Sequence, residues 1–300
     1  MTEPLVLPEH LSFSQKSTTE KCSWQYVLGR LLKAPQQDSW ASVGGKATHS
    51  ATEEWDGWTL QGRWETDPKI LEDLWIKHFD LAIEETEQYA DYPVEQWRAS
   101  GRASKTWPNK ENRDWWDDHG PAFVKAWVNY RMSNPGLQIA ELVNQTTGEM
   151  VPGIEVPGEV VLADRTVKFF IDRVFVNNEG AYFISDLKSG SHVPDDAGQL
   201  GTYNVGLVDI YGVWAAWGSF WMARSGATPW EDMRMWPRER LEHDYKIARE
   251  IQEQGLVTAT RSSLCSGCSV RESCYAVNGK DSDKYPLPWE VSIKPRVSAA

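Results

Sequence analysis

Residues 167 to 187 contain the pattern that most restricts how this chain can fold. Two segments rich in β-branched and aromatic residues, Val167 to Val176 and Ala181 to Leu187, flank the sequence Asn177-Asn178-Glu179-Gly180. Asparagine and glycine readily adopt the backbone angles of tight turns, so this pattern predicts an antiparallel β-hairpin. Because the two strands of a hairpin are neighbours, polar side chains near their ends are expected to lie close together.

Three polar residues stand on the predicted hairpin, namely Asp172 on its first strand and Asp186 and Lys188 at the end of its second. Residues two apart in a strand project from the same face, so Asp186 and Lys188 point together. A pair of carboxylates suits a hard divalent cation such as Mg²⁺ or Mn²⁺, and a neighbouring lysine can orient a water molecule. The hairpin therefore predicts a site for metal-assisted hydrolysis, with the alternative that these are ordinary salt-bridge residues.

Strands and helices alternate over much of the chain, which favours the α/β class. Further strands are expected at Leu137 to Val143, at Glu155 to Leu162 and near Ser219 to Ala223. Helices are expected at residues 12–34, 44–58, 195–214 and 237–254. Residues 65–135 are helical in pattern and rich in tryptophan, which favours a helical insertion whose aromatic side chains pack in the core or at an interface.

The chain carries a net charge of −12, which argues against a protein that coats nucleic acid but not against a nuclease, because bound cations reverse the local field. The charge is uneven, and a basic run follows an acidic stretch. The run comprises Arg98, Arg102, Lys105, Lys110 and Arg113. It is typical either of a solvated loop or of a phosphate-contacting segment, and the sequence favours neither.

Four cysteines occur, at positions 22, 265, 268 and 274. Their clustering favours a metal or iron–sulfur site over disulfides in an intracellular chain of this size. Three lie together, so the fourth ligand has to be Cys22. Four thiolates suit a [4Fe–4S] cluster, whereas zinc sites, the alternative, usually have two paired halves. Such a site closes a loop of about 240 residues and joins the N-terminal helix to the C-terminal segment.

The first residues lack a basic segment followed by an apolar one, and no apolar stretch reaches the length of a membrane span. We therefore expect a cytoplasmic protein without a membrane partner.

Five segments resemble, in order, motifs of the RecB-like branch of the PD-(D/E)XK nucleases. SFSQKSTTEKCSWQYVL is similar to the first helix of that family, and GGKATHSATEEW to its Gly-x-x-x-His segment. FFIDRV, SDLKSG and GQLGTY resemble motif two, motif three and the Gln-x-x-x-Tyr motif. The family usually has Gly-Arg where this chain has Phe169-Phe170.

The resemblance implies a restriction-endonuclease-like core, a mixed central sheet flanked by helices, in one domain spanning residues 1–300. This domain would comprise the insertion at 65–135, a nuclease core at 137–224, a helix and cysteine segment at 237–277 and a tail at 278–300. The implied catalytic residues are Asp172, Asp186 and Lys188, and the implied metal ligands are His49, Asp172, Asp186 and the carbonyl of Leu187. Gln199 and Tyr203 would steady the site or the DNA backbone. Glu141, Glu155 and Glu159 compete as the upstream glutamate of the family, so none is assigned.

The cysteine arrangement resembles the iron–sulfur site of AddB-type and CRISPR-associated exonucleases, which implies a [4Fe–4S] cluster on Cys22, Cys265, Cys268 and Cys274. The activity implied is a Mg²⁺- or Mn²⁺-dependent DNA exonuclease that acts at single-stranded or duplex ends in recombination, replication or repair. A phage-encoded enzyme in the host cytoplasm would fit this description. The chain has no Gly-x-x-x-x-Gly-Lys-Ser/Thr loop, so ATP-driven unwinding would need a helicase or recombination partner. The alternative is an inactive nucleic-acid-binding or scaffold protein of the same fold.

Overall fold

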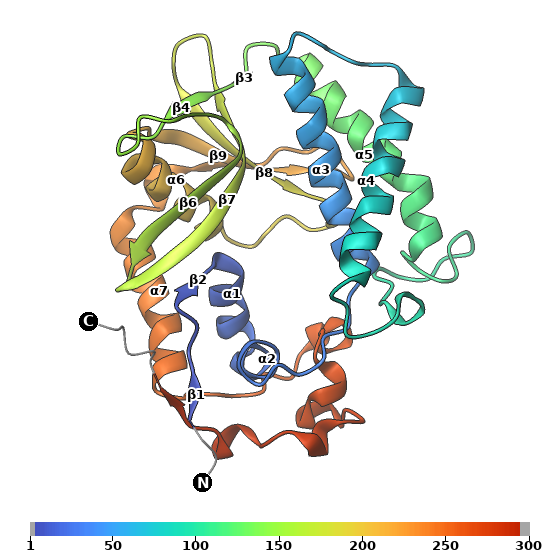
Figure 1. The fold of residues 1–300 in the computed structure, drawn as a ribbon, viewed down its shortest axis with the longest axis vertical. Helices are drawn as coiled ribbons and strands as arrows, with labels where there is room; N and C mark the ends of the chain where they lie inside the picture. The colour runs from blue at the N-terminus through green and yellow to red at the C-terminus, as the bar shows by residue number, and fades with distance from the viewer. Residues whose placement is uncertain (1–3, 295–300) are drawn as a thin grey trace.

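A mixed β-sheet lies at the centre of the molecule (Figure 1). This computed structural model describes residues 4–294, and seven strands of that range form the sheet. They are β2 (His10–Leu11), β3 (Gln138–Ile139), β6 (Ile154–Leu162), β7 (Arg165–Val176), β8 (Tyr182–Lys188), β9 (Ala215–Met222) and β10 (Trp230–Asp232). Strand β7 pairs antiparallel with β3, β6 and β8, whereas β8 and β9 run parallel.

The predicted hairpin is formed by β7 and β8, in a register that places Arg173 opposite Ser185 and Val176 opposite Tyr182. At its turn the N–H of Asn177 donates to the carbonyl of Ala181, and Gly180 takes a φ of +80° that favours glycine. The expected strand at 137–143 is instead divided. Its second half, β4 (Glu141–Val143), pairs with β5 (Met150–Pro152) in a separate two-stranded sheet.

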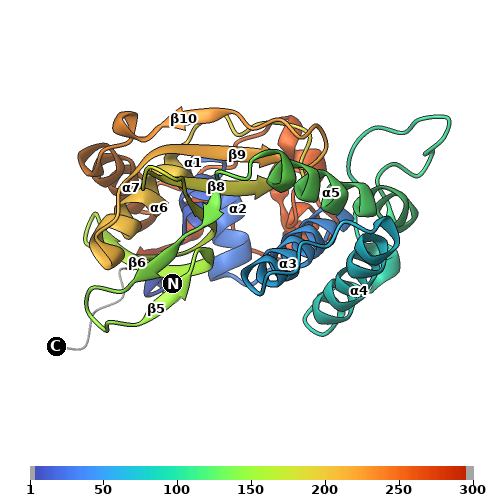
Figure 2. The same ribbon diagram turned by 90° about the horizontal axis from the view of Figure 1, so that it is seen from above.

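Helices cover both faces of the sheet, as expected for a mixed sheet flanked by helices (Figure 2). On one face lie α6 (Gly198–Gly206) and α7 (Arg238–Glu253), and on the other α3 (Trp40–Leu60), α4 (Pro68–Glu87) and α5 (Arg113–Ser133). Strand β9 alternates accordingly, since Phe220 packs with the first group and Trp221 with the second. The helix predicted at 195–214 was too long, because its last turn widens to π geometry and ends at Gly212, whose φ is +66°.

Tryptophan side chains fill the layer made by α3, α4 and α5, as the sequence predicted. Trp55, Trp75, Trp116 and Trp127 are fully buried there. Two helical glycines allow this close packing, because a Cβ on Gly44 would lie 2.1 Å from Trp116 and one on Gly120 would lie 1.9 Å from Trp75. Among the described residues, no helix is both long and apolar enough to span a membrane.

The helix predicted at 12–34 is interrupted at Cys22, which contradicts the sequence prediction. Helix α1 (Phe13–Lys21) ends there because Cys22 is extended, with φ −161° and ψ 96°, and α2 (Ser23–Tyr26) begins one residue later. Tertiary hydrogen bonds account for the break. The N–H of Trp24 donates to the carbonyl of Thr258, and the N–H of Thr258 donates to Oγ of Ser23.

The two ends of the described chain lie together and build a third small core with α2 (Figure 1). Strand β1 (Leu5–Val6) pairs in parallel with β11 (Ile293–Lys294), which lies in the tail expected at 278–300. The tail therefore contains a strand as far as residue 294, and residues 295–300 lie outside the described part. Between α7 and β11 the chain forms short 3-10 turns that carry Cys265, Cys268 and Cys274.

A buried ion pair joins the helical layer to the sheet. Asp56 of α3 and Arg173 of β7 are both fully buried, and Nε of Arg173 donates to Oδ2 of Asp56 over 2.6 Å. Nε1 of Trp127 donates to the same carboxylate oxygen over 2.9 Å, and Arg131 lies 3.6 Å from the other. One carboxylate thus offsets the charge of two buried guanidinium groups.

We expect Asp56→Ala to lower the free energy of unfolding by about 3–5 kcal/mol, because it removes the carboxylate paired with buried Arg131 and leaves buried Arg173 with only the longer contact to Glu155. Urea denaturation followed by tryptophan fluorescence measures this loss. The matched control is Asp73→Ala, which removes an exposed ion pair with Lys69 and should change the same quantity by less than about 1 kcal/mol. Equal effects of the two substitutions would show that the buried pair does not hold the layers together.

Candidate active site

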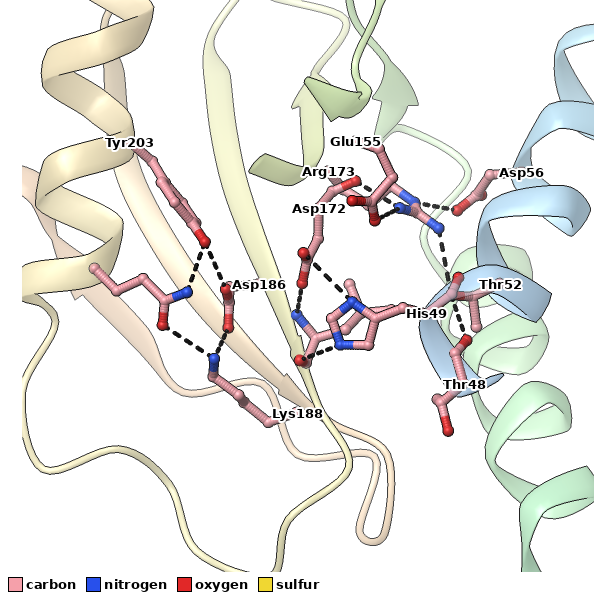
Figure 3. A network of polar contacts seen from close by, with 12 residues as sticks. Thr48, His49, Thr52, Asp56, Glu155, Asp172, Arg173, Asp186, Lys188 and Tyr203 are labelled. Atoms are coloured by element: carbon pink, nitrogen blue, oxygen red, sulfur yellow. Dashed lines mark hydrogen bonds and ion pairs between the residues drawn. The ribbon is translucent and has the colours of Figure 1, made fainter. Parts of the chain in front are cut away.

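The site lies where α3 meets the β7–β8 hairpin (Figure 3). His49 extends from α3, and its Nδ1 lies 3.4 Å from Oδ1 of Asp172 on β7. The other ring nitrogen, Nε2, is hydrogen-bonded to the carbonyl of Leu187 over 2.9 Å. The N–H of Leu187 in turn donates to Oδ2 of Asp172 over 2.6 Å. The structure thus brings together three of the four groups that the sequence assigned to a metal.

Glu155 completes this cluster, although the sequence left it unassigned. One ligand atom each from His49, Glu155 and Asp172 lies within 4.8 Å of the other two, an arrangement that can hold a metal ion. Glu155 has a φ of +45°, which is costly for a residue with a side chain. The strand changes face there, because Val156 packs under α6 and α7 whereas Ile154 packs against the helical layer.

Hairpin register is the signal that could have identified Glu155. Strands β6 and β7 are joined by the two-residue turn Ala163-Asp164, in which both φ values are positive. Counting outward from this turn places Glu155 opposite Asp172 and Glu159 opposite Lys168. The structure distinguishes the competing glutamates, because Glu159 is exposed beside Lys168 and Glu141 is exposed on β4.

A closed ring of polar contacts lies next to the cluster (Figure 3). Nζ of Lys188 lies 2.6 Å from Oδ2 of Asp186 and donates to Oε1 of Gln199 over 3.0 Å. Nε2 of Gln199 donates to the hydroxyl of Tyr203 over 2.6 Å, and that hydroxyl donates to Oδ1 of Asp186 over 3.3 Å. Gln199 and Tyr203, one turn apart on α6, therefore fix both Asp186 and Lys188.

Arg173 links the cluster to the helical layer. Besides its bond to Asp56, its Nη1 lies 3.4 Å from Oε1 of Glu155, and its Nη2 donates to Oγ1 of Thr52 over 3.3 Å. A buried guanidinium with several bonds has one favoured position. Arg173 therefore holds Glu155, the residue on the strained backbone, toward His49 and Asp172.

Burial and mutual repulsion distribute protons unevenly among the acidic groups. Burial and the charge of Asp172 raise the pKa of Glu155 to about 7. Burial likewise raises the pKa of Asp186 to about 6, against the effect of Lys188. Burial disfavours the charged form of His49, but the nearby carboxylates, Asp172 above all, raise its pKa to about 9. Burial opposes ionisation of Asp172, yet His49 and the N–H of Leu187 lower the pKa of that carboxyl.

The four cysteines, all free thiols, line one cavity of about 630 Å³ that also reaches Lys188 and Gln199. Burial raises the pKa of Cys268 and of Cys274, and the charges of the other thiols, Cys22 among them, contribute to both shifts. Among the described residues, no three of the four sulfur atoms lie within 4.8 Å of one another. The four thiols are thus gathered around one shared space.

Comparison with family models supports the resemblance seen in the motifs. The model of the PD-(D/E)XK nuclease superfamily matches residues 10–275, which includes the cluster, the polar ring and all four cysteines. No curated protein matches the chain. Since the family model spans most of the sequence and the sheet, helices and acidic cluster agree with it, the chain belongs to the PD-(D/E)XK nuclease superfamily.

Proposed function

We propose that this chain is a DNA exonuclease of the RecB-like branch that requires Mg²⁺ or Mn²⁺. The observation that carries the proposal is the placement of His49, Glu155 and Asp172 as one cluster beside the ring of Asp186, Lys188, Gln199 and Tyr203. In this proposal residues 1–300 form one nuclease domain with a helical insertion at 65–135. It works in the cytoplasm, or in the host cytoplasm if it is phage-encoded.

The donor set fits a hard divalent cation. Two carboxylates and one imidazole come within 4.8 Å of one another, and the carbonyl of Leu187 lies 2.9 Å from the imidazole. We assign His49, Glu155, Asp172 and Leu187 as ligands, with Asp186 as a further carboxylate at the border of the cluster. A bound Mg²⁺ or Mn²⁺ supplies activation of water and neutralisation of negative charge on the phosphate.

Lys188 is the residue that we assign to the attacking water. Its side chain is 28% exposed, so the ammonium can reach a substrate while Asp186 and Gln199 hold it in place. There it orients the water and stabilises the charge that develops on the phosphate oxygens. Tyr203 contacts both Gln199 and Asp186 and acts through them as a positioning residue.

The cavity beside Lys188 supports a nucleic-acid substrate. Its walls carry Lys21 of α1 and Arg261 of the cysteine segment, together with hydroxyl groups from Ser14, Ser17 and Thr18. Cationic and hydroxyl side chains are the usual partners of phosphate oxygens. The lining of the cavity includes the proposed catalytic lysine. We propose an exonuclease acting in recombination, replication or repair because the motifs resemble those of the RecB-like branch, which commonly processes strand ends. Unwinding of duplex DNA would fall to a partner helicase.

We further propose that Cys22, Cys265, Cys268 and Cys274 hold a [4Fe–4S] cluster. Four thiols around one cavity match the ligand set of such a cluster. Their one-plus-three arrangement along the sequence favours it over zinc, because zinc sites usually have two paired halves. Such a cluster would attach Cys22, which lies between α1 and α2, to the C-terminal segment that carries the other three cysteines.

The nuclease activity is tested by incubating the purified protein with end-labelled single- and double-stranded DNA in Mn²⁺, Mg²⁺ or EDTA. We expect metal-dependent shortening from the ends and a loss of about 10²- to 10³-fold in rate for Lys188→Ala. Lys246→Ala, on the exposed face of α7, is the control and should keep full activity. If the wild-type chain degrades no DNA in any metal, the alternative of an inactive binding or scaffold protein replaces this proposal.

Glu155→Gln should weaken Mn²⁺ binding by about 100-fold or more, whereas Glu159→Gln should leave it unchanged. The pKa of Glu155, raised to about 7, means that its carboxyl holds a proton at pH 6 and loses it by pH 8. Since that proton competes with the cation, Mn²⁺ affinity of the wild type should rise over this interval, and less so in Glu155→Gln. Titration calorimetry at both pH values measures this. Identical affinities of wild type and Glu155→Gln would exclude Glu155 as a ligand.

Cys22→Ala should abolish the visible absorbance and most of the iron of anaerobically purified protein, and should lower its melting temperature, because the two ends lose their common anchor. Ser266→Ala, in the loop between Cys265 and Cys268, serves as the control. Stoichiometric zinc without iron in the wild type would favour the zinc alternative. Unchanged iron content and melting temperature in Cys22→Ala would show that Cys22 is not a ligand.

A further inference from the structure

A basic loop, residues 98–111, is the feature that the proposed function does not yet use. Residues 97–110 contain four cationic side chains and no carboxylate, in a chain whose net charge is −12. The loop precedes α5 and belongs to the helical insertion (Figure 2). The sequence allowed either a solvated loop or a phosphate-contacting one, and the contacts of the loop bear on this choice.

The basic loop is folded on itself. Ser100 and Glu111 form an isolated β-bridge that closes the loop. Gly101, with a φ of +73°, leaves room for the Glu111 side chain, because a Cβ on residue 101 would lie only 2.6 Å from the Glu111 carboxylate. At the tip, the N–H of Trp107 donates to Oγ of Ser104, and the Trp107 ring packs edge-on against His119 of α5. These contacts give the backbone of the basic loop a defined conformation, from which its cationic side chains project.

Two arginines fasten the ends of the basic loop to the two parts of the proposed site. Arg98 donates from Nη1 to the carbonyl of Gly267, between Cys265 and Cys268. At the other end, both carboxylate oxygens of Glu111 accept from Arg224, at 2.9 and 3.0 Å. Arg224 also donates from Nε to the carbonyl of Ser189, the residue after Lys188. The loop thus extends from the cysteine segment to the catalytic end of β8.

Among the described residues, the three remaining cations of the loop have no side-chain partner. Arg102, Lys105 and Lys110 are exposed, and within residues 4–294 none of them forms an ion pair or a side-chain hydrogen bond. By contrast, the exposed Lys69, Lys168 and Lys246 each lie within 4.0 Å of a carboxylate. Arg113, the last cation of the run, is likewise paired, with Asp80 and Asp117. Within the part of the chain that the structure describes, the positive charge at these three loop positions is therefore not offset by a nearby carboxylate.

We propose that the basic loop binds the phosphate backbone of the substrate strand outside the catalytic cavity, through Arg102, Lys105 and Lys110. The proposal rests on the proposed function, because it extends the substrate path of that same site. Phosphate contacts of this kind are independent of base sequence and release counterions, so they make affinity fall steeply with salt. They also give an acidic chain one cationic surface on which a polyanion can lie.

The test compares two triple variants of the full chain, each in a Lys188→Ala background that keeps the DNA intact. The loop variant combines Arg102→Gln, Lys105→Gln and Lys110→Asn, where asparagine suits the φ of +61° at that position. The control variant combines Lys69→Gln, Lys168→Gln and Lys246→Gln, which removes the same charge from partnered, exposed sites. Fluorescence anisotropy with a labelled single strand of about 30 nucleotides, over a range of salt concentrations, measures affinity.

We expect the loop variant to bind about tenfold or more weakly, and the slope of log affinity against log salt to fall by about 2, since each phosphate contact on a single strand contributes about 0.7. The control variant should bind as its parent does. With Lys188 restored, the loop variant should hydrolyse a dinucleotide at the wild-type rate, because such a substrate does not extend beyond the cavity. Its KM for the long strand should rise with little change in kcat.

Equal affinity and equal salt slope in the two triple variants, with unchanged melting temperatures, would overturn the proposal while leaving the nuclease function standing. Weaker binding of an acidic phosphopeptide, without any change for DNA, would also overturn it and would assign the loop to a protein partner. Failure of the proposed function gives a different result, since the wild-type chain would then cleave no DNA in any metal, whether or not it binds DNA.

Discussion

The buried pair of Arg173 and Asp56 is the interaction on which the rest of the structure depends. It is the point where the helical layer, the central sheet and the metal cluster meet, because one guanidinium contacts α3 and Glu155 at once. Removing either charge from water is costly, so the pair is stable only when the two layers are fully docked. The helical layer therefore docks on the sheet at the same time as the metal cluster takes its geometry. His49 and Asp56, both on α3, reach the sheet together.

The cluster also depends on strain in the sheet. Glu155 stands in a left-handed backbone conformation at the position where β6 changes face, between Ile154 and Val156, which pair with Arg173 and Ile171 of β7. A regular strand would avoid that cost, which is of order 1–3 kcal/mol. The packing of Val156 and Ile154 on opposite sides of the sheet, together with the contact to Arg173, imposes it. The strained backbone at Glu155 directs the carboxylate of this residue toward His49 and Asp172.

A further group of contacts, around Cys22 and the basic loop, connects parts of the chain that lie far apart in sequence. Cys22 interrupts the N-terminal helix because Ser23 and Trp24 bond to Thr258, and the same region shares a cavity with Lys188. The basic loop joins this region to the end of β8 through Arg98 and Arg224. The four cysteines, Lys188 and Gln199 therefore line one cavity, and the basic loop is attached at both of its ends to this part of the molecule.

From the sequence alone, turn chemistry and residue periodicity predicted the β7–β8 hairpin, because these are local properties. The motif resemblance predicted a sheet flanked by helices and the site residues His49, Asp172, Asp186, Lys188, Gln199 and Tyr203. The sequence left three glutamates equivalent, predicted one continuous helix through Cys22 and gave the basic run two interpretations. Only the tertiary structure placed Glu155 in the cluster, ended α1 through hydrogen bonds to Thr258, and attached the basic loop to Gly267 through Arg98 and to Ser189 through Arg224. Each of these outcomes depends on contacts between distant residues, whose free energy exceeds the weak local preferences that a sequence records.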